Sequence, residues 1–145
     1  MSLVRQQIMD AVKTRLQSIT VANGYNFNLG NNIYEWRIRP LAMATLPALV
    51  YRDVETDIEL IEAHRNRLNI EIEIISNSSI VDIRKMIADV YKAIGVDIQW
   101  GGLALNTYPR SDRIMREQEE QTITGAIINI IIEYRTKEWN PYQQL

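Results

Sequence analysis

Residues 67–75 read RLNIEIEII, a run in which polar and apolar side chains alternate up to residue 74. A period of two residues is typical of a β-strand with one face buried and the other in water. Strands buried on both faces lose this alternation, so the run predicts an antiparallel or mixed sheet that is covered on one side. Further strands are predicted over residues 33–38, 48–54 and 122–134, where β-branched and aromatic side chains gather.

Two other segments have the spacing of amphipathic helices. Apolar residues recur every three or four positions over residues 3–19 and over residues 79–94. Ser2 and Ser79 are expected to cap the two helix N-termini. Residues 22–32 lie between the first helix and the first strand and are dense in Asn and Gly, which predicts an ordered turn region.

The change of period along the chain predicts the α+β class. The 145 residues, 46% of them hydrophobic, suit a single domain over residues 1–145 with two amphipathic α-helices packed on a mostly antiparallel or mixed β-sheet. No run approaches 18 consecutive apolar residues, and the N-terminus carries Arg5 without an apolar signal region. Neither membrane insertion nor export is therefore expected.

The composition is poor in residues that do chemistry. The chain has no cysteine and one histidine, His64, which excludes thiolate zinc sites, cysteine nucleophiles and sites that need two histidines of one chain. His64 has no evident catalytic partner in the sequence. Glu71 and Glu73 share the solvent face of their strand and are expected there as solvated carboxylates rather than an acid–base pair. We expect no enzyme activity, no cofactor and no metal.

The net charge of −2 is unevenly distributed. Residues 1–52 carry six basic and two acidic side chains, whereas residues 53–145 carry ten and sixteen. Opposite charge on two surfaces can bring copies together head to tail, and a chance distribution is the competing reading. Arginines interleave with aromatic residues between positions 34 and 52, but acidic residues follow at once and no RNA-binding motif is present. No sequence-specific nucleic-acid binding is expected.

The chain resembles the tail terminator family of long-tailed bacteriophages, the minor tail proteins of the lambda U type and their prophage relatives. The resemblance covers residues 3–141 and lies in the order of the elements and in short phrases. These phrases are RQQIMDAVKTRLQSIT, NGYNFNLGNNIYEWR, LPALVYRD, HRNRLNIEIEI, IRKMIADVYKAIG and GAIINIIIEYRTKEWNP. It implies an α+β domain in a six-fold ring that caps the tail tube, stops its polymerisation and docks to the head completion protein.

The resemblance also implies partners and a location. The partners would be further copies of the chain, the tail tube protein and the head completion protein, with DNA passing through the ring. The location would be the tail or neck of the virion, and the host cytoplasm during assembly. The resemblance carries over no catalytic residue. Another phage neck or tail-completion protein, a small nucleic-acid-binding module and a small hydrolase remain as alternatives.

A ring needs two different and complementary patches on each chain. We expect three basic residues of the N-terminal part to face three acidic residues of a neighbour, with two isoleucines of the last strand adding apolar area. Trp139 precedes Asn140-Pro141, which is expected to end regular pairing, and it either plugs the chain's own core or anchors a partner. Residues 107–121 are expected to form a loop that orders on contact with the tube or head. The candidate interface residues are Arg37, Arg39, Arg52, Asp57, Glu59, Glu62, Ile127, Ile131 and Trp139.

Overall fold

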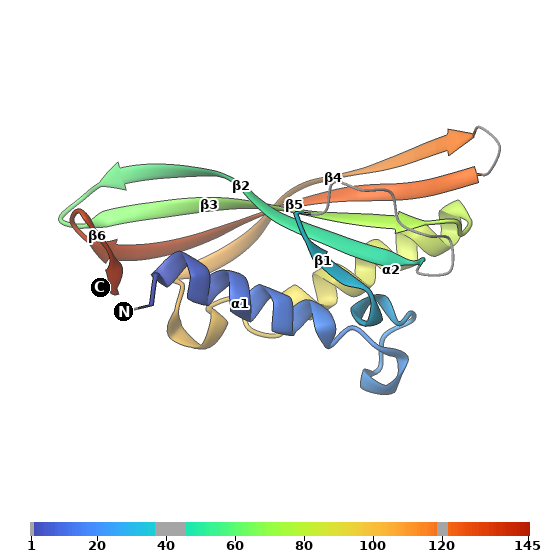
Figure 1. The fold of residues 1–145 in the computed structure, drawn as a ribbon, viewed down its shortest axis with the longest axis horizontal. Coiled ribbons are helices and arrows are strands. Elements are labelled where there is room, and N and C mark those ends of the chain that lie inside the picture. The colour runs from blue at the N-terminus through green and yellow to red at the C-terminus, as the bar shows by residue number, and fades with distance from the viewer. Residues whose placement is uncertain (1, 37–45, 119–121) are drawn as a thin grey trace.

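A computed structural model describes residues 2–36, 46–118 and 122–145. It has two layers, a long twisted sheet and a pair of helices packed against one side of it (Figure 1). The helices are α1 (Val4–Gln17) and α2 (Ile80–Ile94). The strands are β1 (Ile33–Glu35), β2 (Ala48–Leu60), β3 (His64–Ser76), β4 (Asn106–Gln118), β5 (Thr122–Lys137) and β6 (Asn140–Gln144). Short 3-10 turns occur at Val21–Asn23, Leu29–Asn31 and Trp100–Gly102.

The sheet is mixed and mostly antiparallel, and the α+β class is confirmed. Its strand order is β1-β2-β3-β5-β4, with β6 pairing to β5. The pairing of β1 with β2 is parallel and all the others are antiparallel. Among the described residues, nothing pairs with the outer edge of β4, or with the outer edge of β2 beyond Tyr51.

The core lies between the sheet and the two helices. Leu68, Ile70, Ile72 and Ile74 alternate along β3 and are fully buried, as their pattern predicts. They pair with residues of β5 that point the same way, such as Ile130 opposite Ile70. Helix residues complete the cluster: Ile8, Val12, Leu16, Ile83, Met86 and Val90.

One of the two helix N-termini has the cap that the sequence predicts, and the other does not. Ser79 caps α2 through a hydrogen bond in which its hydroxyl accepts from the Asp82 amide at 3.2 Å, as predicted. Ser2 does not cap α1, because the N-cap position is Leu3 and carries no side-chain hydrogen bond. The strand expected over residues 33–38 is β1, which ends at Glu35 before Trp36 takes a φ of 52°.

The loop expected over residues 107–121 is wrong for every position that the structure describes. Residues 106–118 form β4 and pair along β5 in a continuous antiparallel ladder that is interrupted only at Pro109/Ser111. An edge strand needs no apolar side chains along its solvent side, so the charged sequence of residues 106–118 gave no sign of a strand. Ordering on contact is therefore not needed for residues 107–118, and residues 119–121 lie outside the described part.

The C-terminus also continues the sheet where pairing was expected to stop. Asn140 pairs with Lys137 and Gln144 with Thr136, so β6 folds back on the end of β5. Pro141 lacks an amide proton, but a short edge strand has positions at which no amide proton is needed.

Candidate interaction surfaces

The side of the sheet that the helices leave uncovered carries ion pairs within the chain. The Arg52 guanidinium contacts Glu71 at 2.9 Å and Glu73 at 3.1 Å. Arg52 was predicted to reach a neighbouring copy, and here it is 17% exposed and paired in its own chain. The other two basic candidates, Arg37 and Arg39, lie outside the described residues. Glu71 and Glu73 are thus bound to a guanidinium rather than merely solvated.

A second ion cluster lies further along this face. Glu133 is 7% exposed and accepts from Arg65 at 2.8 Å and from Arg67 at 3.3 Å. The hydrogen bond from Arg65 is the main cause that holds the pKa of the Glu133 carboxyl below its usual range. Glu59 is 3.6 Å from Arg67, so this acidic candidate also has a partner in its own chain. Asp57 and Glu62 are exposed.

Ile127 and Ile131 point away from the helices, as the alternation of β5 requires. Ile131 is nevertheless only 8% exposed, because β3 and β4 place Asn69 and Tyr108 on either side of it. Ile127 is half-buried. Neighbouring strands thus cover Ile131 without a helix or a second subunit, and it offers little further area to a partner.

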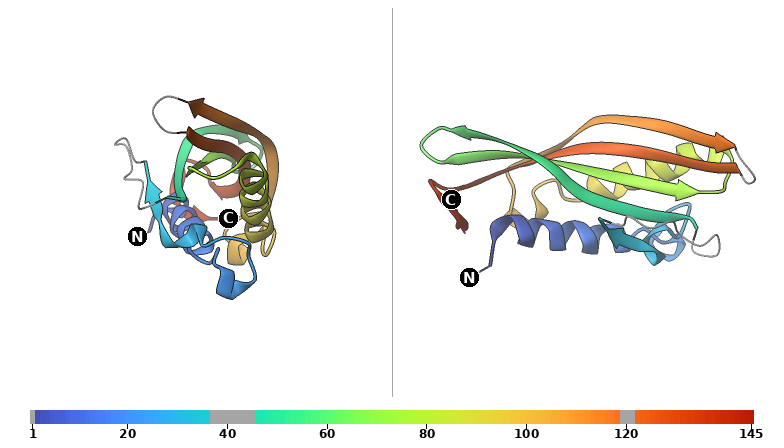
Figure 2. Two further views of the ribbon diagram at one scale, coloured as in Figure 1. Left: turned by 90° about the vertical axis from the view of Figure 1, so that its right-hand side faces the viewer. Right: turned by 45° about the horizontal axis from the view of Figure 1, so that its top comes forward.

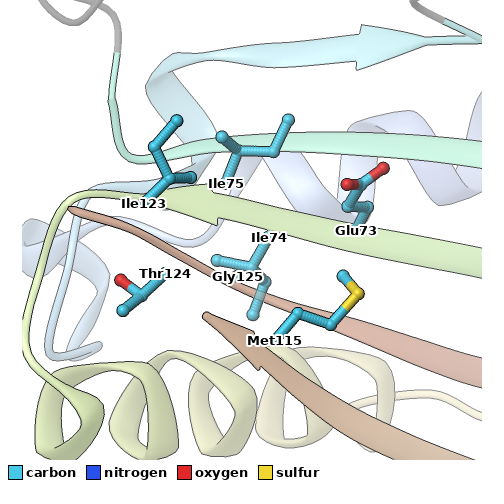
Figure 3. Close-up of a pocket in the computed structure, with 7 residues that line it drawn as sticks. All are labelled: Glu73, Ile74, Ile75, Met115, Ile123, Thr124 and Gly125. Carbon is cyan, nitrogen blue, oxygen red and sulfur yellow. The ribbon is translucent and has the colours of Figure 1, made fainter. Parts of the chain in front are cut away.

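A hollow of about 220 Å³ opens where β5 lacks a side chain, at Gly125 (Figure 3). A Cβ atom on this glycine would stand 2.8 Å from the backbone oxygen of Ile74, so the close approach of β3 requires glycine here. The figure shows side chains of β3, β4 and β5 around the gap. The lining residues are Glu73, Ile74, Ile75, Met115, Ile123, Thr124 and Gly125.

One end of the molecule projects beyond α1 (Figures 1 and 2). The reason is length, because the 14 residues of α1 span about 21 Å and the 13 residues of β2 about 43 Å. The pairing of β2 with β3 puts Ile58 and Leu60 on the same face of the sheet as the core residue Leu68. Elsewhere in the molecule the helices cover this face. At this end that side has no helix over it among the described residues.

This projecting end carries four large, exposed apolar side chains, which we call the apolar tip. They are Ile58 (61% exposed), Leu60 (57%), Ile61 (56%) and Trp139 (81%). Trp139 sits in the β5–β6 turn with a φ of 55°, and its ring meets the His64 ring edge to face at 5.0 Å. Trp139 therefore does not plug the core. Ile58, Leu60 and Ile61 were not identified from the sequence as interface residues. The acidic residues around them in the run DIELIE (57–62) are the signal that could have indicated their exposure.

A second apolar feature lies between the C-terminal end of α2 and the start of β4, and we call it the α2–β4 recess. Its volume is about 340 Å³. The Tyr91 hydroxyl at its edge donates to Asp112 at 2.7 Å, and burial together with this carboxylate raises the pKa of Tyr91 to about 12. Val96 and Leu105 next to the recess are 70% and 39% exposed. The lining residues are Tyr91, Ile94, Gly95, Ile98, Thr107, Tyr108, Pro109 and Ile130.

Within residues 2–36, 46–118 and 122–145, no group of three or more His, Cys, Asp or Glu side chains is placed to hold a metal ion. No helix in these ranges is long and apolar enough to cross a membrane. His64, the one histidine, has its ring against Trp139.

Comparisons with known proteins give a distant structural likeness. No family model matches the chain, and no curated protein matches it. Among solved structures it is similar to a chain in the virion of a native gene transfer agent (GTA) particle, with 11% sequence identity and a TM-score of 0.39. That likeness covers 90% of this chain and 91% of the other.

Proposed function

We propose that the chain is a structural protein of phage assembly that forms a ring on the end of the tail tube. The ring ends polymerisation of the tube and presents the surface that joins the tail to the head. The chain acts by binding alone, without catalysis or cofactor. Its partners are further copies of itself, the tail tube protein and the head completion protein, and DNA passes through the ring.

The observation that carries this proposal is the presence of two different apolar surfaces on one chain, the apolar tip and the α2–β4 recess. A closed ring is built from heterologous contacts, in which one patch of each copy meets a different patch of the next. Exposed apolar area of this kind in a small soluble domain marks an interaction site. The sequence resemblance to tail terminators supplies the identity of the assembly and the expectation of six copies.

A ring is also a physically sensible cap. Each copy needs only a weak contact with the end of the tube, because contacts made by linked copies reinforce one another. Once the ring covers the growing end, the next tube subunit meets a different surface and elongation stops. Such a protein would be found in the virion neck or tail, and in the host cytoplasm while particles are assembled.

The test has two parts. Sedimentation velocity and electron microscopy of the purified protein, alone and mixed with tail tubes, should show a closed ring in solution or on the tube end. Removal of the gene from its phage or prophage should give tails of uncontrolled length that are not joined to heads. A chain that stays monomeric with and without tubes, together with normal tails after removal, would overturn the proposal.

A further inference from the structure

We propose that the apolar tip of one copy docks in the α2–β4 recess of the next copy, with Trp139 as the anchoring side chain. This inference rests on the proposed self-association and names the contact that makes it. The partner surface is thus a second copy of this chain rather than the tube or the head.

The apolar tip has the properties of an anchor. Trp139 is 81% exposed and its nearest ring neighbour is His64, so most of its indole faces water. Tryptophan is enriched among the residues that dominate binding energy at interfaces, because it buries a large apolar area with few rotatable bonds. Leu60 is paired with His64, whose ring contacts Trp139, and Ile58 lies on the same uncovered side of the β2–β3 hairpin. Together they form one projecting, rigid and apolar surface.

The recess has the properties of a receptor for such an anchor. Its volume of about 340 Å³ is at the lower end of the range of small-molecule pockets, which leaves room for one indole ring. Ile94, Pro109 and Ile130 give it aliphatic walls, and the exposed Ile98 widens the apolar rim. The hollow at Gly125 is smaller, about 220 Å³, and has the carboxylate of Glu73 in its lining. An indole is better accommodated in the recess.

Charges around the two surfaces are complementary. Residues 53–62, which include most of the apolar tip, contain five acidic residues and no basic one. Asp53 pairs with Arg5 and Glu59 with Arg67, which leaves Glu55, Asp57 and Glu62 as the exposed acids along the β2 side of the tip. The exposed Arg135 and Lys137 lie on its β5 side.

Beside the recess residue Pro109, β4 carries the exposed Arg110, and the exposed Arg113 and Arg116 follow four and seven positions further along the strand from Pro109. The acid on that stretch of β4, Asp112, accepts a hydrogen bond from Tyr91. The acidic β2 side of the tip is attracted to Arg110 beside the recess, and this arginine takes the place of the basic partners that the sequence suggested.

One chain cannot make this contact with itself. Ile130 in the recess and Trp139 in the tip are nine residues apart along β5 and the turn that follows it. The seven residue steps from Ile130 to the end of β5 at Lys137 alone span about 23 Å of paired strand, at about 3.3 Å per residue. The contact therefore joins different copies and repeats head to tail.

The absence of cysteine from the chain makes a direct test simple. The double variant E138C/V96C keeps Trp139 and the recess lining, and places one cysteine on the exposed residue beside Trp139 and the other on the 70% exposed Val96 at the rim of the recess. Treated with a short-span bismaleimide, it should give a ladder of covalent multimers that ends at the size of the ring. The matched control is E138C/V81C, since Val81 is 56% exposed and lies in the first turn of α2, about 20 Å along the helix from the recess residue Ile94. The control should give no ladder. W139A should raise the dissociation constant of the assembly at least tenfold by sedimentation, while its circular dichroism spectrum stays that of the parent.

The outcomes separate this contact from the function. Rings without an E138C/V96C ladder, or rings unaffected by W139A, overturn the contact and leave the proposed function standing. If W139A forms intact rings but no longer caps tubes, the proposed contact is also wrong, because Trp139 would then bind the tube rather than a second copy. An open-ended ladder without closed rings supports the contact and contradicts the ring. Absence of both ladder and self-association overturns the two proposals together.

Discussion

Asp89 is a buried carboxylate that ties the Asn-rich turn to α2, and its replacement should destabilise the fold. The side chain is 2% exposed and lies on the helix face that meets the turn. It accepts hydrogen bonds from the Asn26 amide at 3.0 and 3.2 Å, from the Asn26 side chain at 2.9 Å and from the Phe27 amide at 3.1 Å. The substitution Asp89→Ala leaves these donors without an acceptor. Asp89→Asn keeps the volume but offers only one oxygen.

The expected loss follows from the three donor groups. Hydrogen bonds to a charged group contribute about 1.5 to 3 kcal/mol each, and contributions at one site are not additive. We therefore expect Asp89→Ala to lower the free energy of unfolding by about 3 to 4 kcal/mol and Asp89→Asn by about 2 kcal/mol. For a chain of this length a loss of about 3 kcal/mol lowers the melting temperature by roughly 10 °C.

Urea and thermal denaturation followed by far-ultraviolet circular dichroism would measure these losses. A matched control is Asp112→Ala, in which an exposed carboxylate that accepts a single hydrogen bond from Tyr91 is removed, and its effect should be at least threefold smaller than that of Asp89→Ala. If Asp89→Ala changes the unfolding free energy by less than about 1 kcal/mol, the turn is not held by this carboxylate and the reasoning fails.

Three further outcomes are expected. Because Arg65 lowers the folded-state pKa of Glu133, the stabilisation from this carboxylate is present above its unfolded pKa and is lost as the pH falls through the folded value. The parent should therefore unfold at a lower urea concentration at pH 3 than at pH 7, and E133Q should make this difference smaller. If E133Q leaves the difference unchanged, the ion pairs of Glu133 do not cause the pH dependence. G125A should cost about 1 to 3 kcal/mol in the same assay, because its Cβ would meet the Ile74 oxygen, and a neutral result would show that β3 can give way. R15K should lower the melting temperature by several degrees, since the Arg15 guanidinium donates to three carbonyls at and just after the end of α2, and an ammonium matches that geometry poorly. An unchanged melting temperature would show that these hydrogen bonds do not stabilise the fold.

The candidate site was predictable only in part. The exposed Trp139 and the acidic positions Asp57 and Glu62 stand on the surface, where a partner can reach them. Arg52 could not be assigned correctly, because its partners Glu71 and Glu73 lie about twenty positions away and become neighbours only through the register of β2 with β3. The α2–β4 recess was invisible for the same reason, since its walls come from four separate segments.

By itself the sequence determined the α+β class, the two faces of β3 and the cap at Ser79, because each depends on spacings of two to four residues along one segment. The tertiary structure alone decided that the charged residues 106–118 form a strand, since the neighbouring β5 supplies the hydrogen-bonding partners that local propensity does not reveal. It also decided that Ile58 and Leu60 stay exposed. Their alternation places them on the covered side of the sheet, but α1 is about half the length of β2 and does not reach them. Burial depends on where other elements end, and no local pattern encodes that distance.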